Sequence, residues 1–149
     1  MGLTKMPRPP GEGQISDRDL REFIRWEEAA CGIVVERALI HLVGDLAVGV
    51  LLQQVVSYWL GKGDCNRIER DGRLWLCKER ADWADITCLK PKQFDRCLAK
   101  LEDMGLIVTA VFGFNAVPTK FISLNLTRLG QQLSKRHFRE CLGGAMSWM

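Results

Sequence analysis

The sequence predicts a mainly α-helical α+β domain that carries one small β-hairpin. Apolar residues recur at helical spacing along most of the chain. Two runs rich in β-branched and aromatic residues, Leu106 to Phe112 and Thr119 to Leu126, are joined by a segment with Gly and Pro, which is typical of a hairpin. The length of 149 residues and the hydrophobic share of 47% fit one globular domain. We expect this domain over residues 16–142, with its core in 33–126.

The two ends of the chain offer little to bury. Residues 1–15 are rich in Pro and Gly and predict a flexible arm, and residues 143–149 predict a short tail. The first residues hold no apolar run of a secretory signal, and the apolar stretch from Ile33 to Leu60 is interrupted by charged residues. We therefore expect a cytoplasmic protein without a membrane span.

Cysteine and histidine are placed in a way that disfavours a metal site. None of the six cysteines forms a C-x-x-C pair, and His41 and His137 are far apart in the sequence. A structural zinc ion needs clustered ligands. We expect reduced cysteines that mostly serve as small apolar core residues, with no metal and no cofactor.

The first expected helix begins at Ser16, because a hydroxyl can accept the orphan backbone N–H bonds of a helix start. Leu20, Phe23 and Ile24 place an apolar stripe on it, and it is expected to end near Gly32. Residues 33–35 predict either a short strand or an extended connector.

Two helices are expected next. The shorter one covers Arg37 to Val43 and is closed by Gly44. Asp45 then caps a strongly apolar helix that we expect at the centre of the core. Residues 61–71 are polar and rich in Gly, which predicts an exposed loop.

A short strand over 73–77 and a short helix over 79–86 follow, with a turn at 87–89. Pro91 suits the first turn of another helix, because its missing N–H has no intrahelical acceptor there. Gly105 is expected to end that helix in the left-handed conformation. The stripe that this helix buries consists of Phe94, Cys97, Leu98 and Leu101.

A last helix with a basic face is predicted from Thr127 onward, ending before Gly143. It carries Arg128, Lys135, Arg136 and Arg139. A basic amphipathic helix can hold phosphates or pack against a partner helix, and an ordinary solvated surface has the same pattern. Charge is unevenly distributed, since residues 87–149 have nine basic against four acidic side chains.

The order from Asp45 onward is helix, strand, helix, turn, helix and hairpin. With GDLAVGVLLQQVVSYW (44–59), DGRLWLCKERADWADITCLKPKQFDRCLAKLEDMGLI (71–107) and FGFNAVPTKFISLN (112–125), the chain resembles the winged helix-turn-helix domains of phage and plasmid replication proteins and of mobile-element regulators. The resemblance covers about residues 33–126. It implies a double-stranded DNA-binding protein, acting in replication initiation or organisation or in transcriptional regulation, with a recognition helix in the major groove and a wing beside it.

The candidate DNA-binding residues follow from the buried stripe of the helix that begins at Pro91. The helix side chains expected to face outward are Lys90, Lys92, Gln93, Arg96 and Lys100. On the hairpin the candidates are Asn115, Thr119 and Lys120. Gln93 suits adenine, Arg96 suits guanine and the lysines suit phosphates. A merely solvated helix face would look the same, and Asp95, Glu102 and Asp103 share it.

Three further features stay open at the sequence level. Phe114 at the hairpin tip is expected to wedge against a sugar, to fill a partner's pocket or to fold back onto the hairpin. Cations near the predicted strand could extend a phosphate track, or be ordinary surface balanced by neighbouring acids. They are Arg67, Arg70, Arg73, Lys78 and Arg80.

The sequence shows no P-loop, no dinucleotide fingerprint and no nucleophile motif, so we do not expect an enzyme. The alternative to DNA binding is a protein-binding winged helix, an adaptor or an inhibitor of a host nucleic-acid enzyme or defence complex. Homodimerisation through the N- or C-terminal helix is a further candidate interaction.

Overall fold

The computed structural model describes residues 16–30 and 35–135. The chain divides into two units between Val34 and Val35. The predicted arm, the tail, the predicted end of the first helix near Gly32 and residues 33–34 of the predicted connector lie outside the described residues. Among the helices of the described ranges, none has the length and apolar character needed to cross a bilayer.

The first unit contributes one described helix, α1 (Asp17–Ala30). Its predicted start is confirmed, because the Ser16 hydroxyl accepts a hydrogen bond from the Asp19 amide at 3.2 Å. The Asp19 carboxylate accepts in return from the Ser16 amide, so the two residues cap the helix reciprocally. The hydrogen bonds from Ser16 lower the pKa of Asp19.

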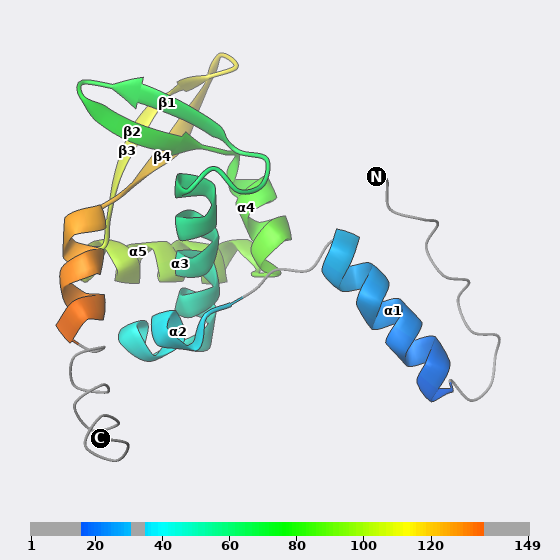
Figure 1. Ribbon diagram of the computed structural model, residues 1–149. Helices are drawn as coiled ribbons and strands as arrows, with labels where there is room; N and C mark the ends of the chain where they lie inside the picture. The colour runs from blue at the N-terminus through cyan, green and yellow to red at the C-terminus, as the bar shows by residue number, and fades with distance from the viewer. Residues whose placement is uncertain (1–15, 31–34, 136–149) are drawn as a thin grey trace. The chain divides into compact units, whose positions relative to one another are not determined.

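The second unit mixes helices with an antiparallel sheet, which confirms the α+β prediction (Figure 1). Its elements in chain order are α2 (Arg37–Val43), α3 (Leu46–Trp59), β1 (Asn66–Arg70), β2 (Arg73–Cys77), α4 (Arg80–Thr87), α5 (Pro91–Asp103), β3 (Ile107–Phe114) and β4 (Val117–Leu124). Residues 126–135 form a further helix that begins one residue before the predicted start. The predicted end of this helix, with Arg136 and Arg139, lies outside the described residues.

The central helix α3 is positioned by its cap and by one close contact. The Asp45 side chain accepts a hydrogen bond from the Val48 amide at 3.1 Å, which confirms Asp45 as the N-cap. A side chain at Gly49 would meet the backbone of Ile40 at 2.9 Å, so glycine allows α2 to lie directly against α3. Val48, Leu51 and Val55 are fully buried, which places α3 in the core as predicted.

The helices α4 and α5 are joined by a tight turn. Cys88 ends α4 in the left-handed conformation with φ of 58°, and Pro91 begins α5, as predicted. The predicted stripe of α5 is confirmed, because all four residues from Phe94 to Leu101 that were assigned to it are buried. Gly105 follows the helix with φ of 73°, as expected for a glycine stop.

The sheet has the strand order β1-β2-β4-β3, so it consists of two antiparallel hairpins joined at their centre. The prediction of an exposed loop over 61–71 is wrong in part, because Asn66–Arg70 forms β1 and pairs with β2. The turn of this hairpin is Asp71-Gly72, both at positive φ. Two such residues are what a two-residue hairpin turn needs.

The predicted hairpin is confirmed as the β3–β4 pair, with different ends. Each strand extends two residues further toward the tip, so that Phe114 pairs with Val117 and the turn is only Asn115-Ala116. Gly113 and Pro118, which were assigned to the joining segment, are strand residues. The reason is that Asn115 and Ala116 both adopt positive φ, which closes a two-residue turn.

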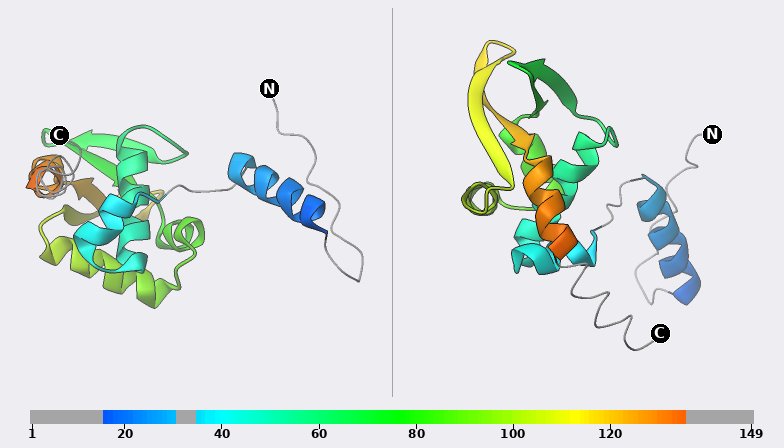
Figure 2. Two further views of the ribbon diagram at one scale, coloured as in Figure 1. Left: turned by 60° about the horizontal axis from the view of Figure 1, so that its bottom comes forward. Right: turned by 60° about the vertical axis from the view of Figure 1, so that its left-hand side comes forward.

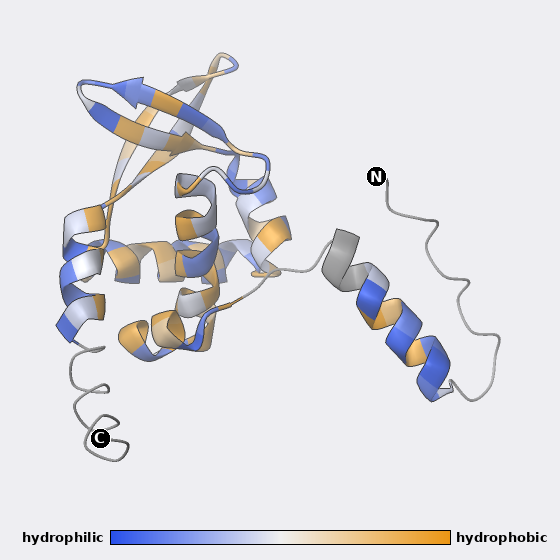
Figure 3. Ribbon diagram, in the orientation of Figure 1, coloured by the Kyte–Doolittle hydropathy of each residue, from blue (hydrophilic) through white to orange (hydrophobic). Residues whose placement is uncertain are grey.

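Two apolar clusters hold this unit together. The larger one joins α2, α3, α4 and α5 to one face of the sheet through residues such as Leu76 and Ile122. The smaller one lies between the two hairpins and contains Trp75, Cys77 and Phe121, with Phe112 and Phe114 packed against it. In Figure 1 and in the right-hand view of Figure 2, the β1–β2 hairpin runs at an angle to the β3–β4 hairpin, so the single sheet is strongly bent. Figure 3 shows β1 mostly hydrophilic, whereas the other strands contain more hydrophobic residues.

Candidate nucleic-acid interface

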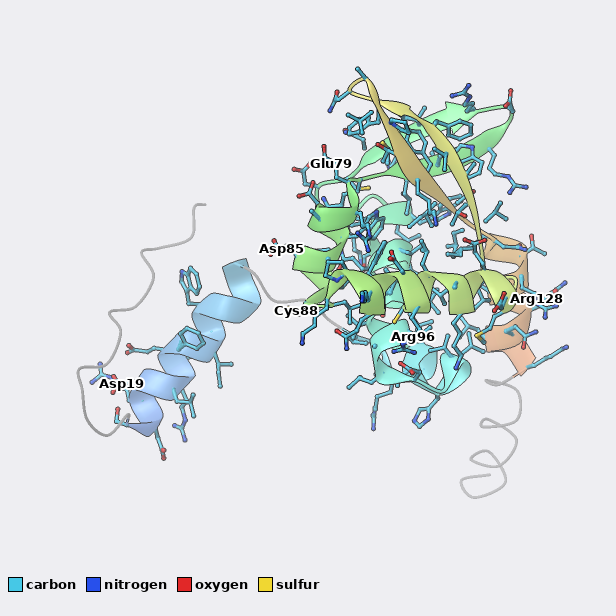
Figure 4. All side chains as sticks on the ribbon, turned by 180° about the vertical axis from the view of Figure 1, so that it is seen from behind. Asp19, Glu79, Asp85, Cys88, Arg96 and Arg128 are labelled. Carbon is cyan, nitrogen blue, oxygen red and sulfur yellow. The ribbon has the colours of Figure 1, made fainter. Side chains whose placement is uncertain are left out.

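The helix α5 presents an exposed cationic side, as predicted. Lys92, Arg96 and Lys100 are exposed, while the opposite side of the helix is buried in the core. Figure 4 shows α5 in front of α3 when the molecule is seen from behind, with Arg96 on its near side. The helix is therefore not covered on this side by the described part of the second unit.

Two acids that share this helix are held by neighbouring elements. Asp95 accepts two hydrogen bonds from the Arg80 guanidinium of α4, at 3.0 and 2.6 Å. Glu102 accepts a hydrogen bond from the Thr109 hydroxyl of β3 at 2.6 Å. Arg80 is the main cause of the lowered pKa of Asp95. Asp95 is thus paired with a cation and Glu102 is hydrogen-bonded to a neutral hydroxyl, while Asp103 is exposed.

Arg96 has a partner that the sequence did not indicate. Its Nη1 lies 3.3 Å from Oδ2 of Asp45, the N-cap residue of α3. The same carboxylate accepts from the Val48 amide, and this bond is the largest cause of the lowered pKa of Asp45. Arg96 is nevertheless 54% exposed, so its guanidinium can still meet a ligand. A guanine contact by Arg96, as predicted from the sequence, would have to compete with this ion pair.

Gln93 is engaged at the start of α5. Its Oε1 accepts a hydrogen bond from the Lys90 backbone amide at 3.0 Å, which caps the helix. The predicted adenine contact needs the same side-chain carboxamide of Gln93. If Gln93 bound a base, it would therefore give up this helix cap. Lys90 is the N-cap residue and lies exposed beside Lys92.

The hairpin candidates lie at different places. Asn115 is in the two-residue turn, and the Thr119 hydroxyl donates a hydrogen bond to the Val117 carbonyl at 3.1 Å. Lys120 is exposed and close enough to Asp95 to lower the pKa of that carboxyl. Of the three hairpin candidates, Lys120 is thus the one that lies near α5.

Phe114 does not lie at the exposed tip. It belongs to β3, is half-buried, and its ring centroid lies 6.5 Å from that of Phe121. Of the three roles considered for it, the structure favours folding back onto the hairpin. The tip itself consists of Asn115 and Ala116.

Most of the cations around β1, β2 and α4 have local partners. Arg67 donates to the Trp59 carbonyl, Lys78 donates to the Asp64 carbonyl, and Arg80 pairs with Asp95. Arg70 and Arg73 instead lie over aromatic rings. These contacts argue against one continuous phosphate track.

Arg128 extends the cationic side beyond the end of α5. A side chain at Gly105 would lie 3.8 Å from its Nε, and Figure 4 shows Arg128 beside the carboxyl end of this helix. A cation at that end is favourable for the helix dipole. The sequence indicated a basic last helix, but it gave no sign that Arg128 would lie next to α5.

The described residues hold no group of three or more His, Cys, Asp or Glu side chains suited to a metal ion. A pocket of about 250 Å³ between α4 and the hairpins is lined by the acids Asp64, Glu79 and Asp82 together with Lys78 and neutral residues. Burial raises the pKa of Cys77 to about 11 and also raises the pKa values of Cys65 and Cys97. These three thiols are therefore poor nucleophiles at neutral pH.

Comparison with known proteins gives no relative: no protein family, curated protein or solved structure matches this chain.

Proposed function

We propose that residues 35–135 form a winged helix-turn-helix domain that binds double-stranded DNA. In this proposal α4 and α5 are the helix-turn-helix, α5 enters the major groove, and the β3–β4 hairpin is the wing. The order of α3, β2, α4, α5 and the hairpin supports it. The hairpin β1–β2 is longer than the single strand that the resemblance implies. The particular process, replication or transcription control within a mobile genetic element, is part of the same proposal.

The observation that carries the proposal is the distribution of charge on α5. Asp95 and Glu102 are bound by Arg80 and Thr109, whereas Lys92 and Lys100 are exposed and make no ion pair within residues 16–30 and 35–135. An exposed helix with unpaired cations is suited to phosphate contacts. Lys92 and Lys100 thus remain available to a ligand, whereas two of the three acids of α5, Asp95 and Glu102, are engaged by neighbouring elements.

The experiment is a binding titration of the full chain with a fluorescent random-sequence duplex over a range of salt. Removal of two charges by Lys92→Gln and Lys100→Gln should weaken binding about tenfold at low salt and reduce the salt slope by about 0.9 for each lost phosphate contact. A matched control removes two exposed cations outside the interface, by Arg37→Gln and Lys62→Gln. Equal affinity of the lysine variant and the wild type would overturn the proposal.

A second candidate function, a protein-binding adaptor or inhibitor, is favoured by exposed apolar side chains. Leu20, Phe23 and Ile24 on α1 are 51%, 44% and 45% exposed. Val111 and Val117 on the proposed wing are also exposed, and such residues suit a protein partner better than a phosphate backbone. Absence of duplex binding by the wild-type chain even at low salt would favour this second function.

A further inference from the structure

The β1–β2 hairpin carries two arginines directly opposite each other. Arg70 and Arg73 are cross-strand partners on either side of the Asp71-Gly72 turn. Like charges in this position destabilise a strand pair. Neither arginine makes an ion pair with a carboxylate in the described part of the chain. The stability of the hairpin therefore does not explain why arginines occupy both of these positions.

Each guanidinium lies over an aromatic ring of the smaller apolar cluster. The Arg70 Cζ is 4.1 Å from the centroid of the Phe112 ring, and the Arg73 Cζ is 5.8 Å from that of Trp75. The two rings pack edge to face at 5.3 Å, so they form one support for both cations. Both arginines are exposed residues. A guanidinium held in this way keeps its outer surface and its N–H groups accessible to a ligand.

This chemistry fits an unpaired nucleic-acid strand. A guanidinium plane stacks with a nucleobase, and its N–H groups bind a phosphate oxygen. A duplex covers its base faces by stacking and pairing, whereas a single strand exposes both bases and phosphates. We propose that Arg70 and Arg73, supported by Phe112 and Trp75, form a binding site for single-stranded nucleic acid. This site is separate from the cationic side of α5.

Apolar neighbours favour a nucleic-acid strand over an acidic peptide. Ile68, the cross-strand partner of Trp75, is 38% exposed, and Phe112 is only half-buried. Such side chains beside the arginines give bases an apolar contact that a run of carboxylates does not use. Competition between an acidic polypeptide and a nucleic-acid strand can distinguish these two kinds of ligand.

The test measures binding of a fluorescent thymidine oligonucleotide of about 20 residues to the full chain, with an abasic strand of the same length for comparison. Arg70→Gln with Arg73→Gln should weaken binding of the thymidine strand about tenfold. Arg70→Lys with Arg73→Lys keeps the charge and should retain binding of the abasic strand, but lose the preference for the strand with bases. Arg37→Gln with Lys62→Gln is the matched charge control.

The result on duplex DNA distinguishes this site from the one proposed on α5. Loss of single-strand binding in the Arg70/Arg73 variants, with duplex affinity kept within about twofold, supports two separate sites. The variant Lys92→Gln with Lys100→Gln should show the reverse, a loss of duplex affinity with single-strand affinity kept within about twofold. Unchanged single-strand binding, an equal loss for both ligands, or displacement of the strand by polyglutamate at equal charge would each overturn the inference. Failure of duplex binding alone would overturn only the function proposed for α5.

Discussion

Arg80, the first residue of α4, binds Asp95 of α5 through two hydrogen bonds, from Nε to Oδ1 at 3.0 Å and from Nη2 to Oδ2 at 2.6 Å. This geometry is the two-point pairing that a guanidinium forms with a carboxylate. The pair joins the two helices of the proposed helix-turn-helix, and it compensates an acid that lies beside Lys92 and Arg96 in sequence. The Arg80–Asp95 pair therefore both holds α5 against α4 and reduces the negative charge on α5.

The two partners of this pair should have opposite effects on DNA binding. Asp95→Asn removes a negative charge near the proposed interface and should raise duplex affinity about threefold at low salt, because one repulsive charge is lost. Arg80→Gln leaves the Asp95 carboxylate without its partner and should lower affinity by a similar factor. Both side chains are more than half exposed, so the folded state should be little affected. Anisotropy titrations at two salt concentrations measure both variants, and equal effects of the same sign would contradict the explanation.

Acid should reduce the stability of the second unit only slightly through Asp45 and Asp95, because exposed ion pairs such as Arg80–Asp95 add little to the free energy of unfolding. The pKa values of both carboxyls are lowered in the folded chain, mainly by the Val48 amide and by Arg80 respectively. A lowered folded-state pKa stabilises the fold above the ordinary carboxyl pKa, and this contribution is lost as the pH falls through the lowered value. Urea unfolding at about pH 6 and about pH 3 should show the loss. Asp45→Asn with Asp95→Asn should lose less stability over the same interval.

Local patterns were sufficient to predict the helices and the buried side of α5. The stripe of Phe94, Cys97, Leu98 and Leu101 has helical period, and only one orientation of the helix buries it. The caps Ser16 and Asp45 and the stop Gly105 were likewise readable, since each acts on the backbone next to it. The same orientation placed Lys92 and Lys100 on the exposed side.

The sequence was less informative about the strand β1 and the charge partners. All five residues of β1 are exposed, so the segment lacks the alternation of a half-buried strand. Its local signal was the Asp71-Gly72 pair, which favours a two-residue hairpin turn. No periodicity links Arg96 to Asp45, because they lie 51 positions apart in the sequence and only the packing of α3 against α5 brings them together.

The exposed thiol of Cys88 should react well before the buried thiols of the second unit. Burial raises the pKa of Cys77 to about 11 and raises that of Cys97, so both remain protonated at neutral pH. Cys88 is exposed. Brief iodoacetamide treatment followed by peptide mass spectrometry should find Cys88 alkylated and Cys77 and Cys97 intact. Treatment in urea is the control, in which all three should react, and early alkylation of Cys77 in the native chain would contradict its burial.

The smaller apolar cluster should determine whether the two hairpins stay together. Phe121 is 2% exposed and its ring packs edge to face on Phe112 at 5.1 Å. Phe121→Ala should lower the free energy of unfolding by about 3 kcal/mol, the order seen when a buried ring is removed. Hydrogen exchange should show lost protection in β1 and β2 before α3. Phe121→Leu is the control with a smaller cavity, and a loss confined to α3 would contradict the role assigned to this cluster.

Asp45 has two tasks, and two substitutions can separate them. Its Oδ1 caps α3 by accepting from the Val48 amide at 3.1 Å, and its Oδ2 holds Arg96 at 3.3 Å. Asparagine keeps an acceptor for the cap but loses the charge, so Asp45→Asn should leave stability within about 0.5 kcal/mol. The same change releases Arg96 and removes a negative charge, and it should raise duplex affinity about threefold at low salt. Asp45→Ala releases Arg96 equally but also loses the cap, at a cost of about 1 kcal/mol in unfolding free energy.

Urea denaturation and anisotropy on the same samples distinguish the two tasks of Asp45, because equal affinity gains with unequal stabilities are expected. If Asp45→Asn bound duplex DNA more weakly than the wild type, the ion pair would be positioning Arg96 for the ligand and not competing with it.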